Sequence, residues 1–134
     1  MLSSFSLDSS MLATIGGAFY PDGYSMVMFP DEAGAMAVAD ELNAQNHEIE
    51  IFHLPPASIL SQITPTVSDA DNPLPSAGTE GATVRAYTKL AREGHHGLLV
   101  RTPDEQAADQ LMQAVRKVPY SMAQRYRMLV IEDL

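Results

Sequence analysis

The sequence predicts an α+β fold of the ferredoxin-like type, with two βαβ halves, a helical insertion between them and a four-stranded antiparallel sheet. Short apolar segments alternate with segments in which apolar residues recur at helical spacing. A further helical stretch separates the two strand–helix–strand units. The length of 134 residues fits one domain. We therefore expect residues 1–134 to form a single domain, with 1–10 as a flexible tail and 55–94 as the insertion.

The first βαβ half is predicted over residues 24–54. Residues 24–29 are apolar on both faces, as is typical of a strand buried on both sides. Asp31 suits the N-cap of a helix to about Gln45. Residues 47–54 alternate in polarity, which favours an edge strand with one partly wet face. The expected apolar stripe of the helix consists of Ala33, Met36, Ala37 and Leu42.

The insertion and the second half follow. Residues 55–63 predict one or two helical turns, and residues 64–78, with three prolines, predict a loop. Thr79 can cap a helix that ends at Gly94. The remaining elements are a strand over 97–101, a helix over 103–117 with the capping box Thr102-x-x-Glu105, and a closing strand over 126–131.

Strands that are apolar on both sides require a cover for both faces of the sheet. In a ferredoxin-like arrangement the helices of the two βαβ halves lie on the same face of the sheet, which leaves the other face uncovered. A bare apolar face of more than a few hundred Å² rarely stays exposed to solvent. Either the insertion over 55–94 or a second subunit must cover the other face. We favour self-association into a homodimer through this face, with the insertion contributing.

Composition excludes several classes of function. The chain has no cysteine, which excludes disulfides, thiolate catalysis and cysteine-ligated zinc. No apolar run reaches the length of a membrane span, and no basic residue precedes the first apolar residues as in a secretory signal. A net charge of −9 weighs against nucleic-acid binding. We expect a cytoplasmic protein without nucleic-acid or membrane partners.

Charge is distributed unevenly along the chain. Residues 1–84 contain 11 acidic residues and no Lys or Arg, whereas residues 85–134 contain all 8 basic residues and 6 acidic ones. The two parts therefore carry about −11 and +2, which sum to −9. Such asymmetry indicates complementary faces within one molecule or between two, or a drift of surface composition in an acidic protein.

Histidines form the first candidate site. The strands over 47–54 and 97–101 are expected to be antiparallel neighbours, so His53 at the end of one lies near the start of the other. The candidate ligands of a divalent metal are His53, His95, His96 and Glu93, with Asp69 or Asp71 from the loop. Against this, neighbouring strand residues face opposite ways, and Gly-His-His-Gly also suits a polar turn. No cofactor is predicted, and the metal is retained as an alternative.

Arginines form the second candidate site. Helix N-termini attract anions, and the guanidinium fork matches a phosphate or carboxylate. An anion site is therefore considered at Arg101, Thr102, Arg125 and Arg127. Pairing with local acids such as Glu132 or Asp104 is the simpler interpretation of these arginines.

Several short patterns resemble one bacterial family. They are Pro21-x-Gly23 before an apolar strand, Phe29 followed by Ala33, Ala37 and Leu42, and a closing run from Gln124-Arg125-Tyr126 to Ile131-Glu132-Asp133-Leu134. Over residues 20–134 the chain resembles small bacterial proteins of the general-stress-protein type. The resemblance implies a stress-associated α/β domain without assigned biochemistry, and it brings no catalytic residues.

Two functions of different class follow. No Gly-x-Ser-x-Gly nucleophile motif and no Gly-rich phosphate loop occur, so an enzyme is the less favoured interpretation. The first hypothesis is a stress-associated interaction or regulatory module that dimerises through its sheet face. The alternative is a small dimeric α+β barrel enzyme, or a ligand- or metal-sensing domain, that uses His53, His95 or His96 as a metal ligand or proton carrier.

Overall fold

The computed structural model describes residues 1–14, 16–67 and 80–134. Six strands, four helices and three short helical turns occur within these ranges. They are, in chain order, β1 (Leu2–Ser4), η1 (Ser9–Met11), β2 (Tyr24–Phe29), α1 (Glu32–Gln45), β3 (Ile51–Leu54), α2 (Pro56–Ser58), the π-helical turn η2 (Ile59–Ile63), η3 (Thr64–Thr66), α3 (Glu80–Arg92), β4 (His96–Arg101), α4 (Glu105–Val115), β5 (Met122–Arg127) and β6 (Val130–Asp133).

The α+β class is confirmed, but the sheet has six strands where four were predicted. Its order is β1-β3-β4-β2-β5-β6. Every neighbouring pair is antiparallel except β1 and β3, which are parallel, so the sheet is mixed. One strand that the sequence did not predict has been added at each edge.

The first added strand is β1, in the segment predicted to be a flexible tail. Leu2 to Ser4 pair with Ile51 to His53 of β3, and Phe5 is buried. The parallel neighbour means that β3 is not the edge strand expected from its alternating polarity. Because β1 has only three residues, none of them buried, hydrophobic pattern gives no signal for it.

The second added strand is β6, which forms a hairpin with β5. The predicted closing strand over 126–131 is wrong, because the chain turns at Met128 and Leu129. Leu129 takes φ 64°, a left-handed conformation that leucine rarely adopts. The turn carries no Gly, Asn or Asp, so residue type does not indicate it.

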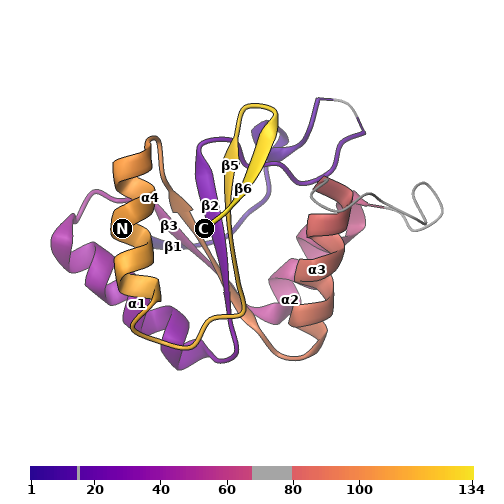
Figure 1. Ribbon diagram of the computed structural model, residues 1–134. Helices are drawn as coiled ribbons and strands as arrows, with labels where there is room; N and C mark the ends of the chain where they lie inside the picture. The colour runs from indigo at the N-terminus through magenta and orange to yellow at the C-terminus, as the bar shows by residue number, and fades with distance from the viewer. Residues whose placement is uncertain (15, 68–79) are drawn as a thin grey trace.

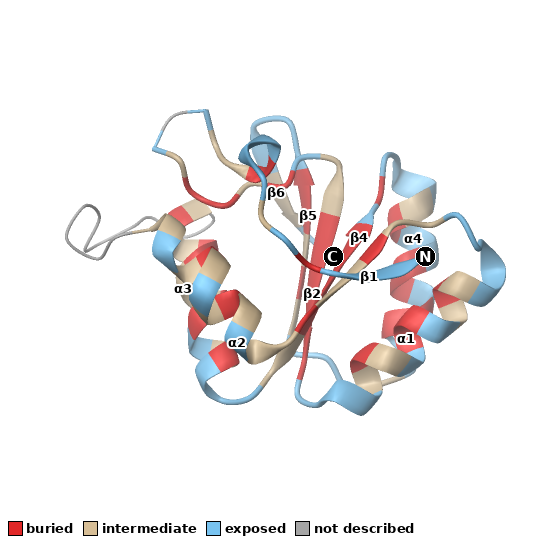
Figure 2. Cartoon of the chain, turned by 180° about the vertical axis from the view of Figure 1, so that it is seen from behind, coloured by how far each residue is buried: buried red, intermediate tan, exposed pale blue. Residues whose placement is uncertain are grey.

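Helices cover both faces of the sheet (Figure 1). α1 and α4 lie on one face, where Val27, Leu98 and Val100 meet Val38 and Leu111. α2 and α3 lie on the other face. Figure 2 shows that buried residues follow the central strands β2 and β4 and the helix sides turned toward them.

The insertion covers the face for which a second subunit was expected. Ile59, Ile63 and Tyr87 pack in one buried cluster with Met28 and Leu99 of the sheet. The central sheet face is therefore buried within the chain and is not accessible to another copy. Of the two covers considered above, the insertion fills this place, and the homodimer stays a prediction that needs another surface.

Helix α1 has the predicted cap and part of the predicted apolar stripe, because Leu42 is buried and Met36 packs against the core. The Asp31 side chain accepts a hydrogen bond of 2.8 Å from the Gly34 backbone N–H, as an N-cap does. Ala33 and Ala37 of the predicted stripe are exposed. In an alanine-rich helix several faces have similar hydropathy, so periodicity does not show which alanines face the core. The residues that are buried are Ala35, Val38, Ala39 and Leu42.

Helix α4 begins later than the capping box predicts. Asp104 is the N-cap, and its side chain accepts a hydrogen bond of 2.8 Å from the Ala107 N–H. Thr102 is buried instead, with its Oγ1 atom 2.7 Å from Ser25 Oγ. The threonine hydroxyl is thus used across the sheet and not at the helix end.

Two further expectations concern the loop and membrane insertion. The predicted loop over 64–78 begins with η3, and its residues 68–78, like the Thr79 cap, lie outside the described residues. In the described ranges no helix has the length and apolarity needed to cross a bilayer.

Candidate functional site

His53 and His96 form a close pair on β3 and β4. These strands are antiparallel neighbours, as predicted, and His53 lies opposite Leu98, which makes it the diagonal neighbour of His96. The distance between His53 Nε2 and His96 Nδ1 is 3.1 Å, so one of these nitrogens donates a hydrogen bond to the other. The ring planes are within 6° of parallel, with centroids 5.3 Å apart.

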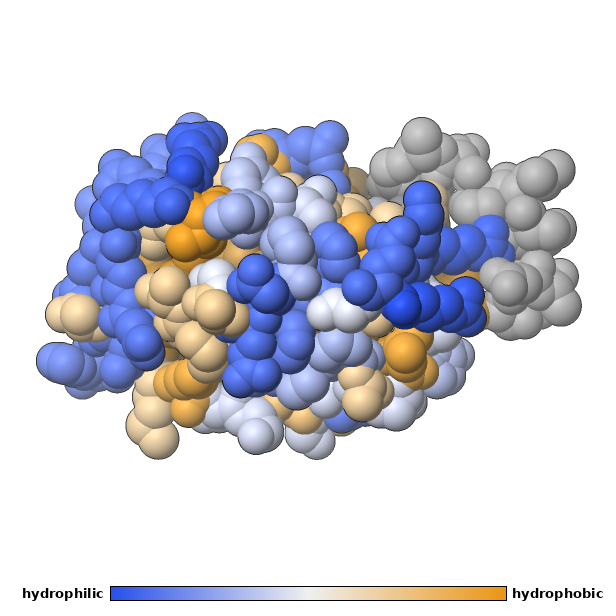
Figure 3. Space-filling view, turned by 90° about the horizontal axis from the view of Figure 1, so that it is seen from below, coloured by the Kyte–Doolittle hydropathy of each residue, from blue (hydrophilic) through white to orange (hydrophobic). Residues whose placement is uncertain are grey.

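His53 is next to the last residue of β3, and His96 is the first residue of β4. In Figure 1 the end of β3 and the start of β4 lie at the lower end of the sheet, where α1 also begins. By strand alternation both histidines share the α1 face with Ile51 and Leu98. Figure 3 looks onto this end and shows mainly hydrophilic residues, with apolar residues in separate patches. Both imidazoles are half-buried, so solvent reaches the site.

The surroundings of His53 favour its neutral form. Burial lowers the pKa of His53 below its ordinary value of 6.5, and the neighbouring His96 lowers it further. Glu32, in the first turn of α1, raises the pKa of His53 and partly offsets these effects. A neutral imidazole has a free nitrogen lone pair, which is the form that binds metals and accepts protons.

The other predicted ligands are not part of this pair. His95 Nδ1 is 2.9 Å from Ser121 Oγ, and that hydroxyl donates to the Met28 carbonyl at 3.1 Å. Glu93 is exposed beyond the end of α3. Asp69 and Asp71 lie outside the described residues. Within the part of the chain that the structure describes, no three His, Cys, Asp or Glu side chains are grouped closely enough to hold a metal.

Two of the predicted anion-binding arginines share one glutamate. Arg125 Nη1 is 3.7 Å from Glu132 Oε1, and Arg127 Nη1 is 3.7 Å from Glu132 Oε2. Arg125 is only 7% exposed, whereas Arg127 is exposed. The structure therefore brings Arg125 and Arg127 together, in the local acid pairing that was the simpler interpretation.

Arg101 and Thr102 lie apart from those arginines. Arg101 ends β4 and lines a hollow of about 440 Å³ together with Glu48 and Glu50. These carboxylates disfavour an anion there. Because Thr102 is buried against Ser25, its hydroxyl is not available at the start of α4. The four predicted anion ligands thus do not form one site.

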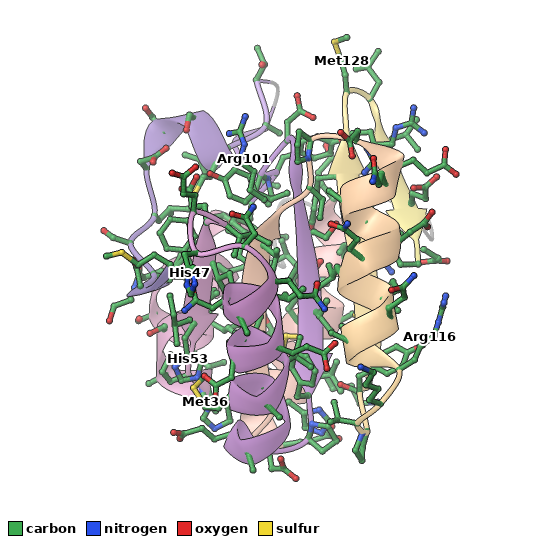
Figure 4. All side chains as sticks on the ribbon, turned by 90° about the vertical axis from the view of Figure 1, so that its left-hand side faces the viewer. Met36, His47, His53, Arg101, Arg116 and Met128 are labelled. Atoms are coloured by element: carbon green, nitrogen blue, oxygen red, sulfur yellow. The ribbon has the colours of Figure 1, made fainter. Side chains whose placement is uncertain are left out.

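A second candidate site, which sequence reasoning missed, is the tip of the β5–β6 hairpin. Three consecutive apolar side chains project there: Met128 is 78% exposed, Leu129 92% and Val130 52%. In Figure 4 Met128 extends beyond the body of the protein, at the end opposite His53. Exposed apolar side chains gathered at one place mark interaction surfaces more often than single ones do.

A hollow adjoins this tip. Its volume is about 580 Å³, and Met128, Leu129 and Ile131 form one side of it. Leu12, Ala13 and Tyr20 are among the lining residues from the N-terminal part, and Asp22 and Glu80 add negative charge. The Tyr20 hydroxyl donates a hydrogen bond to the Arg127 carbonyl, which fixes the base of the hairpin beside the hollow.

Comparison with known proteins does not assign the chain to a family. No protein-family model matches the chain, and no curated protein and no solved structure is significantly similar to it. The candidate sites therefore rest on their chemistry alone. The histidine pair can exchange a proton or bind a ligand, and the hairpin tip can bury apolar surface against a partner.

Proposed function

We propose that this protein is a non-enzymatic interaction or regulatory module that forms a homodimer through the β5–β6 hairpin tip. The observation that carries the proposal is the run of three exposed apolar side chains, Met128, Leu129 and Val130. This revises the contact surface expected from the sequence, because the central sheet face is packed against the insertion.

A second copy of the chain is the partner that fits this surface. The tip and the hollow lie side by side, so a two-fold axis can place the tip of each copy in the hollow of the other, as in an isologous contact. Charges support this pairing, because exposed Arg127 flanks the tip and Asp22 and Glu80 line the hollow. The tip therefore carries a basic neighbour, whereas the hollow is lined by acidic ones.

Backbone conformation gives a further reason to assign a role to the tip. Leu129 holds a left-handed φ of 64°, which costs a leucine about 1–2 kcal/mol. Asparagine or glycine would avoid this cost. Residues whose backbone conformation is unfavourable for their type are concentrated at functional sites.

The mass in solution tests the proposal. Light scattering over a range of concentrations should give twice the 14.5 kDa of one chain. The double variant Met128→Ser/Leu129→Asn should weaken the dimer by about tenfold or more, as expected for apolar residues that carry an interface. The control variant is Tyr120→Ser, because Tyr120 is 38% exposed and lies in the α4–β5 connection, away from the tip. A wild-type monomer at every concentration, or a dimer that the double variant leaves intact, would contradict the proposal.

The cellular setting and the finer fold class belong to the same proposal. We infer a ferredoxin-like core from the central strand order β3-β4-β2-β5, in which each neighbouring pair is antiparallel, and from the shared face of α1 and α4. The stress association and the cytoplasmic location rest on the resemblance to general-stress-type proteins and on composition.

A second candidate function is a small enzyme or a ligand-sensing domain that uses the imidazoles. The observation that favours it is the 3.1 Å contact between His53 Nε2 and His96 Nδ1. It revises the expected set, because His95 bonds to Ser121 instead. If sensing occurs, a ligand bound at the pair should change the association measured by light scattering, and the variant His96→Gln should abolish that change.

A further inference from the structure

We propose that His53 Nε2 and His96 Nδ1 form a two-nitrogen chelate for a divalent transition-metal ion of the zinc, nickel or copper type. The inference names the class of ligand that the histidine site of the second candidate function would bind. It rests on that candidate function only because both use the same two histidines. It does not depend on homodimer formation.

The spacing of the two nitrogens carries the inference. A metal about 2.0–2.1 Å from each nitrogen, with an angle between them of about 90–109°, holds the nitrogens about 2.9–3.4 Å apart. The observed separation of 3.1 Å lies within this range. Since the strand register already brings the rings together, binding needs no rearrangement of the backbone.

The proton balance also permits binding. Each neutral imidazole carries one N–H, and its position on the ring can change. When the N–H of His53 is on Nδ1 and that of His96 is on Nε2, both facing nitrogens offer lone pairs. The hydrogen bond between the rings is then lost, and each ring turns so that its lone pair points to a metal beside the line that joins the two nitrogens. The neutral pair releases no proton overall.

The ligand set determines which metals fit. Imidazole nitrogens suit zinc, copper, nickel and cobalt, whereas magnesium and calcium prefer oxygen ligands. Because the described residues supply no group of three ligands here, water or an external ligand must fill the other coordination positions. The site is thus an open one, as in metal centres that accept a ligand.

Metal titration of the full chain provides the test. Zinc chloride alone, added to metal-free protein, should be followed by calorimetry and by the ¹⁵N signals of the imidazoles. The signals of His53 and His96 should shift together, while those of His47 and His95 stay unchanged. His53→Gln or His96→Gln should weaken binding by about 100-fold, because the second imidazole binds intramolecularly once the first has bound.

Matched variants keep the test decisive. His47→Gln and His95→Gln should bind zinc as the wild type does, since His47 is exposed and His95 bonds to Ser121. Unchanged affinity in the His53→Gln variant, or zinc-induced shifts at His47 or His95 instead of the pair, would overturn the inference. The wild-type spectra decide even if a variant fails to fold. Zinc that binds without altering association would refute the sensing function and leave the chelate intact.

Discussion

The hydroxyl oxygen of Tyr87 lies 3.0 Å from that of Tyr126 in the interior between α3 and β5. Both side chains are fully buried, and they join the insertion to the sheet by a polar contact within an otherwise apolar cluster. Phe19 packs edge-on against Tyr126, with ring centroids 6.0 Å apart. The pair therefore fixes the position of the insertion on the sheet face that it covers.

Removing one hydroxyl of this pair should cost more than removing both. Tyr87→Phe leaves the Tyr126 hydroxyl buried without this partner, so we expect the free energy of unfolding to fall by about 1–3 kcal/mol. The double variant Tyr87→Phe/Tyr126→Phe removes both polar groups and should be closer to the wild type. Urea unfolding of the three proteins measures the difference. A double variant that loses the sum of the two single losses would contradict this explanation.

Alkaline pH should destabilise the protein through the same pair. Burial raises the pKa of Tyr87 well above its ordinary value of 10.0, and it raises the pKa of Tyr126 as well. Above pH 10 the unfolded chain loses these protons while the folded chain keeps them, so stability should fall as pH rises. Urea midpoints between pH 8 and 11 test this. The double phenylalanine variant should show a shallower decline, and an equally steep decline would assign it to other groups.

The N-cap of α4 should depend on Asp104 and not on Thr102. Asp104→Ala removes the hydrogen bond to the Ala107 N–H, so we expect a loss of about 0.5–2 kcal/mol. Asp104→Asn keeps a capping oxygen and should lose much less. Thermal or urea unfolding distinguishes the two variants. Equal losses in both would indicate that the charge, and not the cap, stabilises the helix end.

A substitution at the hairpin tip should raise the stability of the folded monomer and at the same time weaken dimerisation. Leu129→Asn places a residue that tolerates left-handed φ in the turn, so the folded monomer should be stabilised by up to about 1 kcal/mol. The same change removes an apolar side chain that is 92% exposed, so dimerisation should weaken. Unfolding at a concentration that favours the monomer, together with light scattering, separates the effects. A more stable protein with unchanged association would remove Leu129 from the interface.

Local signals predicted the elements whose ends depend on nearby residues. β2 was predicted with the bounds observed, because its apolar run is flanked by turn residues, and Asp31 caps α1 as expected. Thr102 was misassigned because its hydroxyl is used by Ser25, which is 77 positions earlier in the chain. A propensity for capping cannot reveal such a distant partner, and Asp104 also suits the cap by residue type.

The candidate site was predictable only where strand pairing determined it. The antiparallel β3–β4 pair brings His53 to His96, whereas His95 lies just before β4 and contacts Ser121 instead. The hairpin tip was not predictable, because a leucine in a left-handed turn contradicts the usual residue preference. Whether the insertion or a second copy covers the sheet could not be decided from hydropathy, since both would bury the same residues.

The strand order has a consequence for synthesis on the ribosome. β2 is central, yet both of its neighbours, β4 and β5, come from residues 96–127. At about 5–20 residues per second, the nascent β2, α1 and β3 emerge several seconds before these neighbours. During that interval the backbone N–H and C=O groups along both edges of β2 have no native partner strand, although the side chains of this strand are largely apolar. We therefore expect translation pauses before residue 96 to increase chaperone capture, and the sheet core to assemble only late in translation.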